Sequence, residues 1–231
     1  MPERPRPRPT TTGTGEVRYY KRDFWSDENA KYVPPHYRME KCAKIANRIA
    51  GRGPCDLLDI GCGPATLGRL LAPNVNYHGI DIAIHEPAPN LLEVDIVQAP
   101  IAFDGKRFDI VVAQGVFEYL GAYQSQKFSE IAALLKQSGT FLCSYVNFGH
   151  RKPQIYWPYN NVQSPKAFKE SLSQYFVIRR SFPTSLNWGH SEPRRKAVKF
   201  ANMHFNLNVP ILTPWLAVEY FSVCSARGGE R

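Results

Sequence analysis

Residues 57–68 pair an acidic strand end with a glycine-rich turn, a pattern that can hold a cofactor close to the backbone. They read LLDIGCGPATLG, with Asp59 closing a short apolar stretch and Gly61 and Gly63 following it. Glycine permits tight bends and lets a ligand approach the backbone closely. In open parallel sheets, ligands bind at the carboxyl ends of the strands, near the topological switch point. This turn is therefore the first candidate binding element.

Two cofactor classes use such a turn, and the spacing distinguishes them. A dinucleotide fingerprint, Gly-x-Gly-x-x-Gly, requires its third glycine where this chain has Thr66. The spacing Asp-x-Gly-x-Gly-x-[Gly/Ala] instead resembles the first motif of the class I S-adenosylmethionine-dependent methyltransferases. Ala65 takes the third small position, where glycine is more usual. The turn by itself does not decide between the two classes, so the later motifs carry the decision.

Further motifs follow in the order of that family. The segment YHGIDI ends a second strand near Asp81, whose carboxylate can accept hydrogen bonds from both hydroxyls of a ribose. Asp95 ends a third strand, and the resemblance places it facing the adenine amino group. Residues 108–120, FDIVVAQGVFEYL, resemble the fourth-strand motif, and residues 134–140 resemble the turn before strand five. The resemblance spans roughly residues 55–146.

The resemblance implies an enzyme that binds S-adenosylmethionine, releases S-adenosylhomocysteine and needs no metal. Its methyl transfer is a direct in-line displacement, for which the protein mainly aligns the reactants and excludes water. Tyr20 and Trp25 are candidates for an aromatic lid over the sulfonium. Arg38 either pairs with the methionine carboxylate or lies on a solvated helix face. The cofactor-binding residues predicted in this way are Tyr20, Asp59, Gly61, Cys62, Gly63, Asp81, Ile82, Asp95, Ile96, Gln114, Gly115 and Val116.

A hydroxyl acceptor also needs a base, whereas a carboxylate or thiolate acceptor does not. His150, just after the fifth strand, is the first candidate, with an exposed loop histidine as the alternative. Glu118 follows the fourth strand and either acts as a base or shapes the pocket. His190 is the third candidate.

The elements that must position these residues alternate between strands and helices. Apolar runs predict strands at residues 56–60, 76–82, 91–96, 108–114, 140–146, 176–182 and 217–225. Helices are predicted from Pro34 to Ile49 and over residues 65–71, 122–136 and 165–175, the last capped by Ser164. The prolines in residues 82–91 predict a loop where the family has a helix. This alternation predicts an α/β, Rossmann-like, doubly wound and mostly parallel seven-stranded sheet with helices on both faces.

The chain divides into three predicted parts. Residues 1–16 are predicted to be a disordered tail, residues 17–54 an N-terminal lid and helix, and residues 55–231 the methyltransferase domain. Residues 183–215 are a C-terminal insertion between the last two strands, with a helix over about 192–203 capped by Ser191. The insertion is predicted either to roof the substrate pocket or to form a dimer contact.

Composition restricts the remaining possibilities. The 231 residues suit one domain. We expect no membrane-spanning segment, because no apolar run is long enough, and no secretory signal at the N-terminus. Five scattered cysteines without a Cys-x-x-Cys pair argue against disulfides and zinc and favour the cytoplasm. Residues 1–150 carry 17 Lys/Arg against 16 Asp/Glu, but residues 151–231 carry 12 against 4. The excess positive charge therefore lies in the last third, where it favours an anionic partner or serves solubility alone.

The predicted function is methyl transfer to a small molecule, at an oxygen of a secondary metabolite or saccharide, with an anionic acceptor as one form. The alternative is a tRNA or rRNA methyltransferase that uses the basic last third. Residues 113–116, AQGV, lack the Asn/Asp-Pro-Pro-aromatic motif of amide- and adenine-methylating families, which disfavours it. A cofactor-binding protein without catalysis, or an NAD enzyme, is a further alternative. The sequence leaves open whether the protein forms a homodimer.

Overall fold

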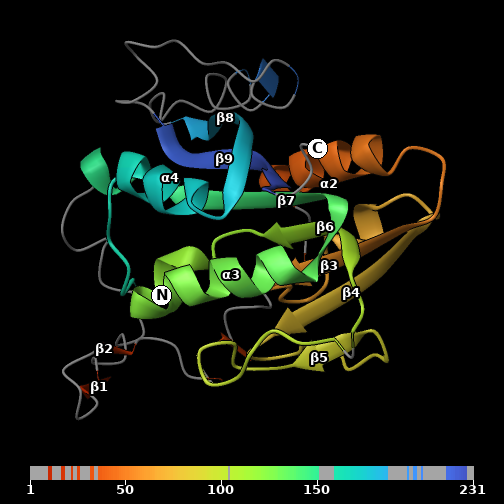
Figure 1. The fold of residues 1–231 in the computed structure, drawn as a ribbon, viewed down its shortest axis with the longest axis horizontal. Coiled ribbons are helices and arrows are strands. Elements are labelled where there is room, and N and C mark those ends of the chain that lie inside the picture. The colour runs from red at the N-terminus through yellow and green to blue at the C-terminus, as the bar shows by residue number, and fades with distance from the viewer. Residues whose placement is uncertain are drawn as a thin grey trace, which may run out of the picture.

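A seven-stranded sheet forms the centre of the protein (Figure 1). The computed structural model describes residues 10–11, 17–18, 22, 25–26, 32–33, 36–103, 105–150, 159–186, 197, 200–201, 204 and 217–227. The strand order is β5-β4-β3-β6-β7-β9-β8. Strand β9 is antiparallel to β7 and β8, and the other neighbouring pairs are parallel. The strands are β3 (Cys55–Ile60), β4 (Val75–Asp81), β5 (Leu91–Glu93), β6 (Phe108–Ala113), β7 (Leu135–Val146), β8 (Phe176–Leu186) and β9 (Ala217–Ala226).

The predicted doubly wound fold is confirmed by the packing on the two faces of the sheet. Alternate side chains of a strand point to opposite faces, so Leu57 and Leu58 of β3 belong to two separate apolar cores. Helix α2 (Tyr37–Ala50) covers the Leu57 face, whereas α3 (Gln124–Leu134) and α4 (Pro165–Ser173) cover the Leu58 face. Because both faces are covered, β3 and β6 are almost continuously buried.

The three helices that cover the sheet begin and end within a few residues of where the sequence predicts them. His36 caps α2, accepting a hydrogen bond from the Arg38 backbone N–H, and the C-cap of α2 is Gly51, which has a positive φ of 60°. The hydroxyl of Ser164 accepts from the Ala167 N–H and caps α4, as predicted.

The predicted helix over residues 65–71 is wrong. A 3₁₀ turn, η2 (Gly68–Leu70), stands there instead. Ala65 has a left-handed φ of 53°, which an α-helix excludes. The Thr66 hydroxyl bonds the Tyr32 carbonyl oxygen at 2.7 Å, so the segment is tied to the N-terminal part of the chain. Apolar periodicity did not reveal this tertiary contact.

Other boundaries differ by a few residues. Strand β5 ends at Glu93, β7 begins at Leu135 rather than at 140, and β8 continues through Leu186. The first four residues of the predicted insertion therefore belong to β8, where Leu186 pairs with Ala217. Short 3₁₀ turns follow β6 and β7, namely η3 (Phe117–Tyr119), η4 (Gly121–Tyr123) and η5 (Phe148–His150).

The predictions for the chain ends concern residues that the structure describes only in part. Residues 10–11 (β1, Thr10–Thr11) pair antiparallel with β2 (Val17–Arg18). The predicted cap Ser191 and most of the predicted helix 192–203 lie outside the described residues, although Ala197, Phe200 and Ala201 are helical. No helix in the described part of the chain is long and apolar enough to cross a membrane.

Candidate functional site

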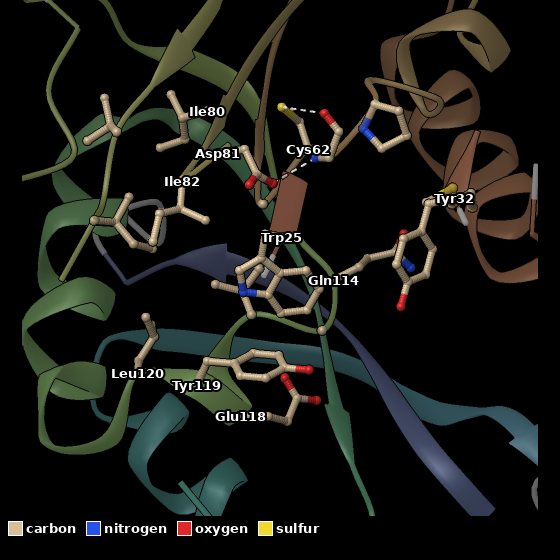
Figure 2. A pocket seen from close by; sticks show the side chains of 18 of the residues that line it. Trp25, Tyr32, Cys62, Ile80, Asp81, Ile82, Gln114, Glu118, Tyr119 and Leu120 are labelled. Atoms are coloured by element: carbon tan, nitrogen blue, oxygen red, sulfur yellow. Dashed lines mark hydrogen bonds between the residues drawn. The ribbon is translucent and has the colours of Figure 1, made fainter. Parts of the chain in front are cut away.

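A pocket lies at the carboxyl ends of β3, β4, β6 and β7, and Figure 2 shows it from close by. The turns that follow these strands form one side of it. Side chains from the N-terminal part of the chain, Trp25, Tyr32, His36 and Arg38, also line it. The pocket therefore occupies the edge at which an open parallel sheet binds ligands.

The turn after β3 is built so that its backbone borders the pocket. Gly61 has a positive φ of 73°, and a Cβ atom added there would lie 2.5 Å from Cγ2 of Val116. Both requirements exclude a side chain at this position. The N–H groups of Gly61 and Cys62 bond the Ile80 carbonyl oxygen at 2.8 and 3.1 Å. The turn is thereby fixed to the end of β4.

Two carboxylates mark the next two strand ends. Asp81 accepts hydrogen bonds from the Gly63 N–H at 2.7 Å and from the Ala83 N–H at 3.1 Å. Asp95 accepts from the Val97 N–H at 2.9 Å. A carboxylate accepts several hydrogen bonds at once, because each of its oxygens has two lone pairs, and acceptors of this kind suit hydroxyl or amino groups in the pocket.

The turn after β6 brings one unsatisfied donor to the pocket. The Gln114 side chain lines it, and its Nε2 is buried without a hydrogen-bond partner among the described residues. Gly115 has a φ of 66°, and a Cβ there would meet open space. Its N–H donates to the hydroxyl oxygen of Ser144 on β7 at 3.0 Å. A buried donor without a partner indicates a group that the ligand satisfies.

Arg38 brings a cation to the pocket from the first turn of α2. Its Nη1 donates to Oε1 of Glu219 on β9 at 2.8 Å. The Glu219 carboxylate raises the pKa of Arg38 above its ordinary value. Burial by itself would raise the pKa of Glu219, but Arg38 and the hydrogen bonds to that carboxylate hold it below the ordinary value. Both groups are therefore charged at neutral pH.

Glu118 and three aromatic rings form the side of the pocket nearest β6 and β7. Glu118 is fully buried. Its Oε1 accepts from the Val146 N–H at 2.8 Å, and its Oε2 has no partner among the described residues. Burial raises the pKa of Glu118 to about 8. Trp25 packs edge-to-face on Tyr119, with ring centroids 5.2 Å apart (Figure 2). The ring centroids of Tyr119 and Tyr159 are 5.3 Å apart.

Comparison with protein families matches residues 35–179 to a methyltransferase domain. The matched residues make up more than half of the chain. The chain belongs to this methyltransferase family. The methyltransferase uses S-adenosylmethionine as its methyl donor, in agreement with the sequence motifs. Comparison with curated proteins gives no match.

Solved structures resemble this methyltransferase in fold. A methyltransferase from Haloferax volcanii, solved with a methyltransferase activator, has a TM-score of 0.61 at 16% identity, over 88% of this chain and 95% of that one. The plantazolicin methyltransferase BpumL has a TM-score of 0.57 at 15% identity, over 89% and 91%. The N-methyltransferase NodS from Bradyrhizobium japonicum has a TM-score of 0.54 at 12% identity, over 88% and 98%. At these identities the similarity concerns the fold.

The pocket of the methyltransferase fits its cofactor chemically. Carboxylates at Asp81 and Asp95 suit the hydroxyl and amino groups of an adenosine. The unsatisfied Gln114 donor and the Arg38 cation suit a carboxylate. The open space at Gly115 allows a close backbone approach. No cluster of potential metal ligands occurs among the described residues.

The predicted cofactor residues converge on this pocket, with two exceptions. Those that line it are Gly61, Cys62, Gly63, Asp81, Ile82, Asp95, Ile96, Gln114, Gly115 and Val116. Asp59 does not line it: its carboxylate is buried, accepts from the Tyr77 hydroxyl at 2.9 Å and has a pKa raised by burial to about 7. Asp59 therefore contributes to the packing beside the turn after β3 and does not face the pocket. Tyr20 lies outside the described residues.

The structure describes the side chain of only one of the three predicted bases. Glu118 lines the pocket. His150 ends the η5 turn, and the position of its side chain is not described. His190 lies outside the described residues. The sequence analysis missed His36, Met39 and Tyr119, which also line the pocket. Tyr119 directly follows the predicted Glu118 in a turn, which is the local signal that could have found it. Tyr159 lines the pocket as well; it belongs to the aromatic segment after the fifth strand, for which the sequence leaves a substrate role and packing against the insertion open.

Proposed function

We propose that this methyltransferase acts on a small molecule and transfers the methyl group to an oxygen of a secondary metabolite or saccharide. The observation that carries the proposal is the aromatic side of the pocket, formed by Trp25, Tyr119 and Tyr159 beside the cofactor-binding turns. Aromatic faces and edges pack well against flat or ring-shaped molecules. This side of the pocket therefore suits a small acceptor molecule that contains a ring.

The order of the strands suggests how the cofactor lies. Asp81 ends β4 and Asp95 follows β5, toward one edge of the sheet, and they would hold the ribose and the adenine. Gly61 and Gln114 follow β3 and β6 and, together with Arg38 of α2, would hold the methionine part. When bound, S-adenosylmethionine supplies an electrophilic methyl group on a sulfonium. The acceptor side, near β6 and β7, then lies next to that methyl group.

The residues of this pocket would act mainly by orientation and by excluding water. Well-oriented groups can lower a barrier by several kcal/mol without charge stabilisation. Of the three base candidates, Glu118 is the one whose side chain is described and lines the pocket. Its Oε2 is free to accept a proton, and a pKa near 8 suits a base that works in mildly alkaline solution. Glu118 would thus receive the proton of an acceptor hydroxyl.

Two structural neighbours support a small-molecule acceptor but leave its atom open. One is a methyltransferase for plantazolicin, solved with a desmethyl analogue, and the other is an N-methyltransferase. A nitrogen acceptor is therefore the nearest variant of the proposal. The basic last third would favour an anionic acceptor or RNA. Five of its twelve Lys and Arg residues are described, and the other seven lie outside the described residues.

The proposal is tested by transfer of a labelled methyl group from S-adenosylmethionine. Parallel reactions would contain a panel of phenols, sugars and small amines, and separately bulk tRNA and rRNA. We expect label in the small-molecule panel, strongest for hydroxyl compounds, and none in RNA. Label in RNA that survives raised salt would contradict the proposal, since binding by charge alone weakens steeply with salt. Label confined to amines would contradict the oxygen assignment.

A further inference from the structure

Glu219 is buried behind the pocket and does not line it. Its side chain is 2% exposed, and it comes from β9, the last strand of the fold. The pocket is lined by residues of the N-terminal segment, of α2 and of the turns that follow β3 to β7. A carboxylate buried at this position requires compensation, because an isolated charge in an apolar interior is very costly.

Three side chains supply that compensation. Oε1 of Glu219 accepts hydrogen bonds from Nη1 of Arg38 at 2.8 Å and from Oγ of Ser144 at 2.7 Å. Oε2 accepts from Oγ1 of Thr184 at 2.8 Å. Thr184 is itself 1% exposed and lies on β8. The carboxylate is therefore held on both oxygens, and its orientation is fixed by strands β7 and β8.

Two of these contacts lead to the pocket. Arg38 lines the pocket directly, with a side chain that is 32% exposed. Ser144 accepts from the N–H of Gly115, which lines the pocket in the turn after β6. Glu219 thus fixes a cation and a backbone turn at the same end of the site. At the distant end of the pocket, the carboxylates of Asp81 and Asp95 accept hydrogen bonds from the backbone N–H groups of Gly63, Ala83 and Val97.

We propose that Glu219 is a positioning residue for the amino-acid end of the cofactor, acting through Arg38 and through Ser144 and Gly115. This inference rests on the cofactor orientation given under Proposed function. The Arg38 Nε also donates to Nδ1 of His36 at 3.3 Å. Glu219 directs the guanidinium so that the N–H groups bonded neither to Glu219 nor to His36 face the carboxylate of the methionine part. A paired guanidinium keeps donors for a second carboxylate, because it carries five N–H groups in a fixed plane.

Two ligands distinguish the amino-acid half of the cofactor from its adenosine half. S-adenosylhomocysteine carries the adenosine and the amino acid, whereas 5′-methylthioadenosine carries the adenosine and the sulfur alone. We expect Glu219→Gln to weaken binding of S-adenosylhomocysteine about tenfold, the loss of one well-placed charged hydrogen bond. Binding of 5′-methylthioadenosine should change by less than about twofold, because no contact to the adenosine is altered. Arg38→Met should show the same selectivity.

Thr184→Val tests orientation without altering any charge. This variant removes one hydrogen bond that holds Glu219 and leaves Arg38 and Glu219 ionised. We expect a weaker but equally selective loss, about threefold for S-adenosylhomocysteine. Ser222→Ala is the matched control: it removes a buried hydroxyl of β9 that bonds Ser181 and does not reach the pocket. It should leave the affinities for both ligands unchanged.

Isothermal titration of both ligands against these four variants decides the proposal. Equal weakening of both ligands would indicate a general structural effect and would overturn the positioning role. Tighter binding of S-adenosylhomocysteine by Glu219→Gln would also overturn it, because the Glu219 charge would then oppose the cofactor carboxylate. If the ratio of the affinities for the two ligands stayed unchanged in every variant, this inference alone would be overturned. Failure of the unaltered protein to bind S-adenosylhomocysteine would overturn the proposed cofactor site as well.

Discussion

Glu118 and Glu219 are two buried carboxyl groups near one pocket, and their surroundings shift their pKa values in opposite directions. Glu118 has one oxygen without a partner among the described residues, and burial outweighs the effects of Arg38 and of the Val146 N–H, so its pKa rises to about 8. Glu219 is just as buried, but Arg38 and two hydroxyl groups outweigh burial and lower its pKa. The same residue type is therefore suited to take up a proton at one position and to hold a fixed charge at the other.

The opposite shifts predict opposite effects of pH on two matched variants. Stability from Glu118 is complete below the carboxyl's ordinary pKa near 4.5 and is lost as the pH rises through about 8. Glu118→Gln has no such loss, so its Tm relative to the unaltered protein should rise by several degrees between pH 5 and pH 9. A difference that stays constant with pH would contradict the buried, uncompensated state of Glu118.

For Glu219 the lowered pKa means that stability is present above the ordinary value and is lost as the pH falls. Glu219→Gln should therefore have a lower Tm than the unaltered protein at pH 7, and the gap should narrow toward pH 4. Thermal unfolding of both variants in the same buffers makes each one the control for the other.

At the residue scale, the sequence predicted what is local and missed what is distant. Asp81, Asp95 and Gly61 could be found because each follows a recognisable apolar strand. The role of Glu219 could not, because its partner Arg38 is 181 positions away. Asp59 was predicted to bind the cofactor from its place in the motif. The structure places its carboxylate against the Tyr77 hydroxyl, and Asp59 is not among the residues that line the pocket.

At the scale of elements, the glycine turn after β3 depends on one position more than on the others. The left-handed φ of Gly61 and the 2.5 Å approach to Val116 both oppose a methyl group. Gly61→Ala should therefore cost about 1–3 kcal/mol of stability and weaken S-adenosylhomocysteine binding at least about tenfold. Urea unfolding and titration would measure the two effects.

Gly53→Ala is the control for this variant, because a Cβ there meets nothing within 4 Å and the φ of Gly53 is not positive. It should change neither stability nor affinity noticeably. If Gly61→Ala behaved like the control, the turn would not be as tightly constrained as its geometry implies.

Elements were predictable where periodicity and caps agreed, as in α2, in α4 and in the strands of the central sheet. The helix predicted over residues 65–71 failed because Ala65 is left-handed and Thr66 bonds the N-terminal segment. The sequence pattern of residues 65–71 predicts the start of a helix, but the long-range hydrogen bond of Thr66 holds this segment in another conformation. The extension of β8 through Leu186 was likewise hidden, since its pairing with β9 is non-local.

At the scale of the whole molecule, the sheet separates two cores, and the pocket lies at its edge rather than within either core. Phe128 of α3 is fully buried and packs on Phe117, Phe168 and Phe176 in the core beneath α3 and α4. Phe128→Ala should destabilise the fold by about 3–5 kcal/mol. Affinity for S-adenosylhomocysteine below the unfolding transition should be unchanged, because Phe128 does not line the pocket.

Phe200→Ala provides the comparison, since Phe200 is 61% exposed. Its effect on the free energy of unfolding should stay within about 0.5 kcal/mol. A comparable loss of stability in both variants, measured by urea unfolding, would contradict the assignment of Phe128 to the core.

The central claim is that S-adenosylmethionine binds at the carboxyl edge of the sheet with its adenosine held by Asp81 and Asp95. Titration of S-adenosylhomocysteine against the unaltered protein, Asp95→Ala and the exposed control Glu86→Gln tests it most directly. We expect binding by the unaltered protein and the control, and affinity lower by about 10- to 100-fold in Asp95→Ala. Asp81→Asn should show a similar loss. Unaltered binding in both aspartate variants would contradict the account.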